Sequence, residues 1–184
     1  MQPVSDEIRI RAAITADAAA LADIYASFVL ANYSSFEEVP PTADEMAQRM
    51  QHAPRLPWLV AETAGDVVGF AYAGPHHQRS AYRWAADSSV YLRNSAVGRG
   101  VGTALYQHLI PLVRDHGYVS LFAGIALPNE ASVRLHESFG FRRIGTFPAS
   151  GFKLGAWRDV GWWSLPLRDP PDQPDEPRQW DGQL

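Results

Sequence analysis

The segment from Val90 to Leu105 constrains the fold more than any other part of the chain, because a strand pattern runs into a glycine-rich loop that opens a helix. Glycines at alternate positions, Gly98, Gly100 and Gly102, let the backbone turn tightly and approach a ligand without an intervening Cβ. The unpaired amides of the first helical turn, together with the helix dipole, form an anion site suited to a pyrophosphate. Arg99 adds a positive charge at the mouth of the loop.

Other phosphate-binding motifs fit this loop less well. A dinucleotide-binding fingerprint requires a further glycine where this chain has Thr103, and a P-loop requires a Gly-Lys-Ser/Thr sequence that the chain does not contain. The remaining alternative is a flexible surface loop with a glycine at the start of a helix.

Hydrophobic periodicity along the rest of the chain predicts the order β-α-α-β-β-β-α-β-α-β-β. Thr15 and Thr42 stand where helix N-caps belong, and Gly117 stands where the third helix stops. We expect strands at 8–11, 58–61, 67–73, 87–92, 119–125, 141–147 and 151–165. Strands that alternate with helices in the middle and form hairpins at either end predict an α/β (α+β) fold, a mixed sheet of about seven strands with helices on both faces.

Composition places the chain among globular proteins and limits its partners. A length of 184 residues suits a single domain, which we expect at 1–167, and a net charge of −4 argues against nucleic acid as a partner. No apolar run approaches the ~20 residues of a membrane-spanning helix, and the first seven residues lack the features of a signal peptide, so we expect a cytoplasmic protein. The chain contains no cysteine, which excludes disulfides, thiolate metal sites and a cysteine nucleophile.

Residues 168–184 differ in composition from the rest of the chain. They include five acidic residues, two arginines and four prolines but almost no apolar side chains. A segment of this kind cannot bury enough surface to order itself, so we expect a flexible C-terminal tail. The alternative is that Trp180 docks the tail on the body of the protein.

The glycine loop resembles the pyrophosphate-binding motif of the GNAT acetyltransferases, whose pattern is Gln/Arg-x-x-Gly-x-Gly/Ala. The matching residues are Val97-Gly98-Arg99-Gly100-Val101-Gly102, with Val97 departing from the first position. The segment from Asn129 to Phe141 is similar to a later motif of the same family, in which an asparagine opens a helix along the cofactor and a Gly-Phe pair ends it. The resemblance implies a mostly antiparallel GNAT sheet and acetyl-CoA as co-substrate, with no metal.

The same resemblance implies which residues hold acetyl-CoA. Asn129 is expected to hydrogen-bond the pantetheine and Ser132 to lie near the pyrophosphate, although Asn129 fits a plain helix N-cap equally well. Val97 weakens the electrostatics of a loop that binds phosphate mainly through backbone amides. The full set of expected cofactor contacts is Val90, Tyr91, Leu92, Val97, Gly98, Arg99, Gly100, Val101, Gly102, Thr103, Asn129 and Ser132.

Five further strings resemble one branch of this family, the phosphinothricin N-acetyltransferases. They occupy residues 58–62, 71–75, 82–84, 89–91 and 151–160, and the likeness spans about residues 8–167. The branch also includes acetyltransferases for methionine sulfoximine and methionine sulfone. The resemblance implies an N-acetyltransferase for the primary amine of a small amino-acid-like substrate, acting as a homodimer with the closing strands at the interface.

Amide formation from an amine and a thioester requires loss of a proton from the ammonium, polarisation of the carbonyl and protonation of the leaving thiolate. Asp87 stands where the branch carries a glutamate taken as the general base. Since aspartate is one methylene shorter, we expect a bridging water. The alternative is a structural carboxylate that pairs with Arg83 or caps a turn.

His136 is the second expected catalytic residue. It occupies the position at which many GNAT enzymes place a tyrosine that protonates the departing sulfur, and at which this branch has a histidine. A neutral-range imidazole can donate or accept a proton there. A packed or solvated helical histidine is the alternative, and the sequence leaves open whether Asp87 or His136 is the principal base.

Arg79 is the expected ligand of the acceptor's carboxylate, because a guanidinium binds a planar carboxylate through two hydrogen bonds. Its alternative is an ordinary surface arginine. Phe36 and Tyr82 are expected to wall the pocket or to pack in the core, and Lys153 to contact the substrate or a partner subunit. The pair His76-His77 has no further ligand at helical spacing and makes a poor metal site, so we expect a solvated loop there.

Other functions remain possible with the same motifs. A GNAT enzyme for a protein N-terminus or another metabolite amine would differ only in its acceptor pocket, and Arg79 favours a free amino acid. A non-catalytic acyl-CoA sensor would keep Gly100 and Asn129 but would not need Asp87 and His136. A serine hydrolase is disfavoured because the chain contains no Gly-x-Ser-x-Gly sequence.

Overall fold

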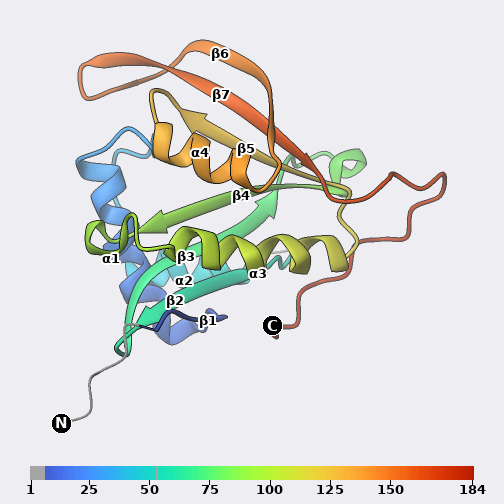
Figure 1. The fold of residues 1–184 in the computed structure, drawn as a ribbon, viewed down its shortest axis with the longest axis horizontal. Helices are drawn as coiled ribbons and strands as arrows, with labels where there is room; N and C mark the ends of the chain where they lie inside the picture. Colours follow the sequence, from blue (N-terminus) through green and yellow to red (C-terminus); the bar gives the residue numbers. More distant parts are fainter. Residues whose placement is uncertain (1–6, 53) are drawn as a thin grey trace.

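The computed structural model describes residues 7–52 and 54–184. Within them, a seven-stranded sheet in the order β1-β2-β3-β4-β5-β7-β6 is flanked by four α-helices (Figure 1). The strands are β1 (Arg9–Ala12), β2 (Trp58–Thr63), β3 (Asp66–Pro75), β4 (Ala85–Leu92), β5 (Ser120–Ala126), β6 (Arg142–Lys153) and β7 (Ala156–Pro166). The helices are α1 (Ala18–Leu30), α2 (Ala43–Gln51), α3 (Val101–Asp115) and α4 (Glu130–Ser138), with 3-10 turns η1 (Thr15–Asp17), η2 (Ser80–Tyr82) and η3 (Asn94–Ala96).

The only parallel pair in this sheet, β4 with β5, is short. It extends over three positions and ends where Asp87 lies opposite Phe122. Beyond that point β4 stays paired with β3 as far as Leu92, while β5 stays paired with β7 as far as Ala126. The two central strands therefore diverge, and their facing edges are left without a strand partner over these residues.

Side chains of β3 and β4 alternate between the two faces of the sheet, because successive residues of a strand point to opposite sides. On one face, Tyr91 packs edge-on against Tyr25 of α1, with ring centroids 4.9 Å apart. On the other face, the Ser88 hydroxyl lies 3.2 Å from the Tyr106 hydroxyl of α3. Figure 1 shows α3 crossing one face of β2–β4 with α2 behind the sheet, so the predicted mixed, mostly antiparallel sheet with helices on both faces is confirmed.

Local capping explains where the first two helices begin. Thr42 caps α2 as predicted: its hydroxyl accepts from the Glu45 amide at 3.2 Å, and the Glu45 carboxylate accepts from the Thr42 amide at 2.7 Å. The first helix begins at Ala18, three residues later than the predicted cap at Thr15. Residues 15–17 form a 3-10 turn instead, because the Asp17 carboxylate accepts the Ile14 amide and both terminal nitrogens of Arg11.

The C-terminal segment 168–184 lies along the body in the structure, unlike the flexible tail expected from its composition. Trp180 is 3% exposed, and its amide donates to the Arg55 carbonyl at 2.9 Å. The segment also satisfies the carbonyls at the end of α3: the Arg178 amide donates to His116 at 2.8 Å, and the Arg178 guanidinium to Asp115 at 2.6 Å. These contacts favour the alternative that Trp180 docks the segment on the body, and the flexibility of the segment stays a prediction. The domain boundary at 167 stays a prediction.

The hydrophobic core forms one continuous cluster of side chains from the helices and the sheet. Its fully buried side chains come from α1, from α3 and from the central strands, and include Leu21, Ile24, Leu59, Phe70, Leu105, Tyr106 and Leu121. None of the helices in the described part of the chain has the length and apolarity that a bilayer crossing requires.

Candidate functional site

A cavity of about 300 Å³ lies where β4 and β5 diverge, and we call it the splay groove. Its walls are the free edges of the two strands, the start of α4 and the end of α1 with the loop that follows. Seven of the residues singled out in the sequence line it together: Val90, Tyr91, Leu92, Val97, Asn129, Ser132 and His136. Other lining residues include Phe28, Asn32, Ser34, Ser88, Ser89 and Leu135. A strand edge without a partner offers backbone donors and acceptors to an extended ligand.

The glycine loop stands at one end of this groove. Gly98 and Gly100 have φ values of 77° and 83°, the left-handed region that favours glycine, and a Cβ at either position would meet no atom within 4 Å. Gly102 serves packing instead, since a Cβ there would lie 3.2 Å from Leu135 of α4. The first i→i−4 hydrogen bond of α3 runs from Ala104 to the Gly100 carbonyl, so the amides of residues 101–103 precede it and remain available for an anion.

Arg99 and Val101 lie elsewhere than the splay groove. Both line a separate cavity of about 140 Å³ together with Ile8 and Ser95, on the far side of the loop. Among the expected cofactor contacts, the loop residues 98–103 are thus beside the groove and not in its lining, and their role in binding stays a prediction.

Asn129 caps α4 and also ties it to another element. Its side-chain oxygen accepts from the Ser132 amide at 3.2 Å, the plain N-cap that the sequence allowed. Its side-chain nitrogen donates to the Ser34 hydroxyl at 3.3 Å, in the loop after α1. The asparagine is therefore held at the wall of the groove from two directions.

His136 is 3% exposed and has both ring nitrogens engaged. Nδ1 lies 2.7 Å from the Ser132 carbonyl oxygen, which can only accept, so Nδ1 carries the proton of the neutral ring. Nε2 lies 2.9 Å from the Tyr106 hydroxyl. Burial lowers the pKa of His136, with the bond to the Ser132 carbonyl acting against it, so the neutral ring is favoured. In this geometry the ring also orients the Tyr106 hydroxyl, and the catalytic role of His136 stays a prediction.

Asp87 lies at the last β4–β5 pair and binds a partner that the sequence did not suggest. Its carboxylate is 2.6 Å from His76 Nδ1, and the ion pair with Arg83 is not formed, because Arg83 pairs with Glu176. Burial raises the pKa of Asp87, and the hydrogen bond and charge of His76 oppose that rise.

The interpretation of His76 as a solvated loop residue is corrected by the structure. Its side chain is 24% exposed, and its ring stacks on Phe122 with centroids 4.4 Å apart. The β3–β4 hairpin brings it there, since the His76 amide donates to the Ala85 carbonyl across the turn at 3.3 Å. The sequence held no signal for this contact, because it depends on the β3–β4 register that places residue 76 two positions from Asp87.

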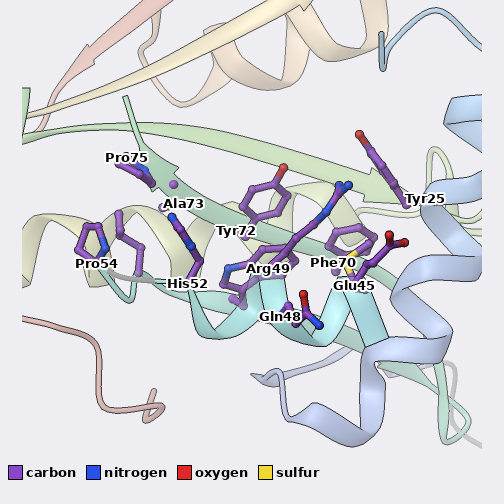
Figure 2. A pocket seen from close by; sticks show the side chains of 14 residues that line it. Tyr25, Glu45, Gln48, Arg49, His52, Pro54, Phe70, Tyr72, Ala73 and Pro75 are labelled. Carbon is purple, nitrogen blue, oxygen red and sulfur yellow. The ribbon is translucent and has the colours of Figure 1, made fainter. Parts of the chain in front are cut away.

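A second cavity, of about 520 Å³, opens on the α1–α2 face, and we call it the α2 pocket. Trp58 and Tyr72 form its floor, stacked with ring centroids 4.0 Å apart. Figure 2 shows the Arg49 guanidinium between the Tyr72 and Tyr25 rings, with His52, Pro54 and Pro75 toward the other end of the pocket. The guanidinium carbon lies 5.8 Å from the centroid of the Tyr25 ring. Gly74, the β3 residue paired with Asp87, also lines it, so the lining of this pocket extends to the strand position beside Asp87.

The four expected substrate residues do not line either cavity. Arg79 and Tyr82 lie in the loop that carries His76, and the Tyr82 ring stacks on His77 at 4.9 Å. Phe36 packs against Gly151, where a Cβ would meet the ring at 2.3 Å. The Lys153 ammonium donates to the carbonyls of Ser35, Glu37 and Phe28 at 2.6, 2.8 and 3.4 Å, which uses its three protons to hold the loop after α1. Substrate contact by these residues stays a prediction.

No group of three or more histidine and acidic side chains suited to a metal ion occurs among residues 7–52 and 54–184. The candidate site comprises the splay groove and the α2 pocket, whose linings include Ser88 and Gly74, the chain neighbour and the β3 partner of Asp87.

Residues 10–162 match the family described as the acetyltransferase (GNAT) domain. The chain belongs to this family. The predicted family and fold are confirmed, and so is the enzyme class, an N-acetyltransferase that uses acetyl-CoA.

Relatives with assigned activities cover nearly the whole chain. A phosphinothricin N-acetyltransferase from Streptomyces viridochromogenes is 40% identical over 96% of this chain and 98% of its own. An L-amino acid N-acyltransferase, MnaT, from Escherichia coli is 34% identical over 90% and 97%. An L-methionine sulfoximine/L-methionine sulfone acetyltransferase from Salmonella typhimurium is 34% identical over 86% and 94%.

Solved structures agree with this assignment. Salmonella typhimurium yncA with its cofactor acetyl-CoA superposes with a TM-score of 0.87 at 33% identity, over 91% of this chain and 98% of that one. A phosphinothricin acetyltransferase from Sinorhizobium meliloti in complex with acetyl-CoA gives 0.85 at 33% identity, over 91% and 95%. A ribosomal-protein-alanine N-acetyltransferase from Brucella melitensis gives 0.83 at 35% identity, over 86% and 99%.

Proposed function

We propose that this enzyme acetylates the primary amine of a small, free amino-acid-like substrate of the phosphinothricin, methionine sulfoximine or methionine sulfone type. The observation that carries the proposal is the position of Asp87, between its β3 partner Gly74 in the lining of the α2 pocket and its chain neighbour Ser88 in the lining of the splay groove. Acetyl-CoA enters through the groove and the acceptor through the pocket, so that amine and thioester meet beside one carboxylate. The names of the three relatives support this acceptor class.

The α2 pocket suits a small acceptor in volume and chemistry. Its 520 Å³ falls within the range of small-molecule sites. The stacked Trp58 and Tyr72 rings offer an apolar surface to a side chain, while Arg49 is already held by Glu37 through two hydrogen bonds of 2.8 Å. Arg79, exposed in the loop that carries His76, therefore stays the proposed ligand of the acceptor's carboxylate.

A panel of acceptors tests the proposal, with acetyl-CoA as donor and release of free thiol as the readout. Phosphinothricin, methionine sulfoximine and methionine sulfone are expected to exceed peptides in kcat/KM by at least about 10-fold, equivalent to about 1.4 kcal/mol of transition-state binding. The ordinary amino acids and their methyl amides complete the panel. A preference for peptides would contradict the proposed acceptor class.

Arg79→Gln sharpens this test. Loss of the guanidinium is expected to raise KM for a free amino acid but not for its methyl amide, which has no carboxylate. Arg134→Gln is the matched control, because Arg134 is exposed on α4 and pairs there with Glu130. An equal effect of Arg79→Gln on acid and amide would contradict the role of Arg79.

A protein N-terminus is the second candidate acceptor. The likeness to a ribosomal-protein-alanine N-acetyltransferase, at 35% identity, favours it. Such an enzyme must admit an acceptor with an extended chain in place of a carboxylate. The peptides of the panel decide between the two candidates.

We also propose that the enzyme acts as a homodimer in the cytoplasm. Five large apolar side chains are exposed on the β6–β7 hairpin, the closing strands named from the sequence: Ile144, Phe147, Phe152, Leu154 and Trp157. Exposed apolar clusters of this kind mark contact surfaces, and a second copy of the chain is the proposed occupant.

A further inference from the structure

His76 and Asp87 form a pair whose geometry is fixed on several sides. His76 Nδ1 lies 2.6 Å from Asp87 Oδ1. The imidazole stacks on Phe122 of β5 at 4.4 Å and meets Trp162 of β7 edge-on at 5.9 Å. Tyr82 lies edge-on at 6.1 Å from the side of η2. An imidazole packed against three rings and bonded to a carboxylate has one preferred orientation.

The bond to Asp87 also fixes which nitrogen carries the proton. An ionised carboxylate can only accept, so Nδ1 is the donor and Nε2 of the neutral ring has an unprotonated lone pair. No hydrogen bond to Nε2 is found within the described residues. Of the described groups packed around this ring from β4, β5, β7 and η2, Asp87 is the carboxylic acid, and the others are Phe122, Trp162 and Tyr82. The ring is therefore a base with a free lone pair, next to one negative charge.

The ring lies beside the last β4–β5 pair and next to the lining of the α2 pocket. Phe122, on which it stacks, is the β5 residue paired with Asp87 at the last position before the strands diverge. Pro75, which precedes His76, lines the α2 pocket. The imidazole thus follows a residue that lines the α2 pocket, and Nδ1 already engages the Asp87 carboxylate.

We propose that His76 is the catalytic base of this enzyme, with Nε2 accepting the proton of the acceptor ammonium and Asp87 orienting the ring and stabilising the imidazolium. This inference rests on the proposed function. The ammonium gives one proton to Nε2, which later releases it to solvent. The freed nitrogen lone pair forms the N–C bond to the thioester carbonyl, and collapse of the tetrahedral intermediate breaks the C–S bond. The second proton of the amine ends on the departing sulfur.

Steady-state kinetics of His76→Gln, Asp87→Asn and the double variant test the proposal. Glutamine keeps a donor for Asp87 but cannot accept a proton, so kcat/KM is expected to fall at least about 100-fold while acetyl-CoA affinity is unchanged. Asp87→Asn is expected to lose a similar factor, and the double variant no more than either single one, because the two residues act as a unit. His108→Gln is the control, since His108 is exposed on α3 and bonds only to the Ala104 carbonyl.

The two single variants together separate a base from a merely structural residue. A His76→Gln rate within about threefold of wild type, together with a large loss in Asp87→Asn, overturns the proposal and leaves Asp87 as the direct base.

A measurement that needs no acceptor makes the inference independent of the acceptor class. Long-range ¹H–¹⁵N spectra of the imidazoles, with His76→Gln for assignment, are expected to show His76 as the Nδ1–H tautomer at neutral pH. The Nε2–H tautomer contradicts the proposal. If only peptides are acetylated, the proposed acceptor class fails while the kinetic test of His76 proceeds with the peptide.

Discussion

At Asp87, burial and a neighbouring imidazole act in opposite directions on the same carboxyl group. Burial raises its pKa, while the hydrogen bond and charge of His76 lower it. A carboxylate that is both desolvated and hydrogen-bonded can take part in catalysis in two ways: it can accept a proton from the amine, or it can stabilise an imidazolium. Both roles require the carboxylate for turnover, and neither requires it for binding the nucleotide end of acetyl-CoA.

We therefore predict that Asp87→Ala lowers kcat by about 10²–10⁴-fold with little change in acetyl-CoA affinity. Thiol release under saturating acceptor gives kcat, and isothermal titration gives the affinity. Asp66→Ala, at the start of β3 in the hairpin turn, is the matched control, because it removes an exposed carboxylate remote from both cavities. Turnover unchanged in Asp87→Ala would remove this residue from the mechanism.

Lys153 was singled out from a distinctive sequence string, but its contacts in the structure differ from those the sequence suggested. The sequence suggested a contact with substrate or a partner, whereas the ammonium binds three carbonyls of residues 28–37 in the structure. Residues of that segment, Asn32 and Ser34, line the splay groove. The lysine therefore supports the groove wall from behind.

Lys153→Met is predicted to destabilise the protein by about 2 kcal/mol, the magnitude of charge-assisted hydrogen bonds lost inside a protein. Urea denaturation measures the change in stability. Weaker acetyl-CoA binding is also expected in this variant, because the wall of the splay groove loosens. Arg142→Met, an exposed cation at the start of β6, is the control. Unchanged stability with a raised KM for the acceptor alone would instead support the substrate contact expected from the sequence.

The other site residues divide in the same way into those that the sequence identified and those that only the structure revealed. Asp87 and the groove residues Asn129 and His136 were identified from motif positions, because each belongs to a string whose order along the chain is informative. His76 and Tyr72 were not, because their importance arises only from the β3–β4 register, which places residues from distant strings on one face. A single sequence contains no measure of that register.

At the scale of elements, the order of strands and helices follows from periodicity, and the sequence predicted it. The divergence of β4 from β5 did not follow, since both strands read as continuous and only their pairing shows where the parallel contact stops. The start of α1 also differed, because Asp17 binds Arg11 across the chain and not the helix that follows. Tertiary partners decided both features.

The loop before α3 supplies an element-scale prediction. Gly100→Glu is expected to weaken acetyl-CoA binding at least about 100-fold, because a carboxylate beside a pyrophosphate at about 4 Å costs about 4 kcal/mol near a protein surface. Equilibrium dialysis or titration calorimetry measures the affinity.

Gly65→Glu is the matched control for backbone strain. Gly65 has φ 88° against 83° for Gly100, and a Cβ at either position meets nothing within 4 Å, but Gly65 lies in the β2–β3 turn. Its variant is expected to bind acetyl-CoA as the wild type does. Equal affinities for both variants would count against the loop as the phosphate site.

At the scale of the whole molecule, the C-terminal segment is the part that composition describes least well. Trp180→Ala is predicted to cost about 3–5 kcal/mol, the usual range for removing a buried tryptophan side chain. Leu184→Ala, 55% exposed in the same segment, is the control and is expected to be neutral. Chemical denaturation distinguishes a docked segment from a mobile one, for which both substitutions would be neutral.

Association of two copies is the remaining whole-molecule prediction, and the exposed faces of the β6–β7 hairpin locate it. Trp157 is 65% exposed and packs on Phe152 with ring centroids 5.3 Å apart, which leaves a wide apolar surface in contact with water in one chain. Light scattering during gel filtration is expected to give twice the chain mass of 20.3 kDa for the wild type. Trp157→Asp is expected to give the single-chain mass, because a buried unpaired carboxylate opposes association.

Ile14→Asp is the matched control for that experiment. Ile14 is 57% exposed next to β1, at the opposite edge of the sheet from β6, so its variant is expected to keep the wild-type mass. A dimer that persists in Trp157→Asp would place the interface elsewhere, and a wild type that runs as one chain at micromolar concentration would contradict the dimer itself. Since Lys153 and Phe152 adjoin on β6, loss of the dimer is also expected to loosen the loop that Lys153 holds, and with it the wall of the splay groove.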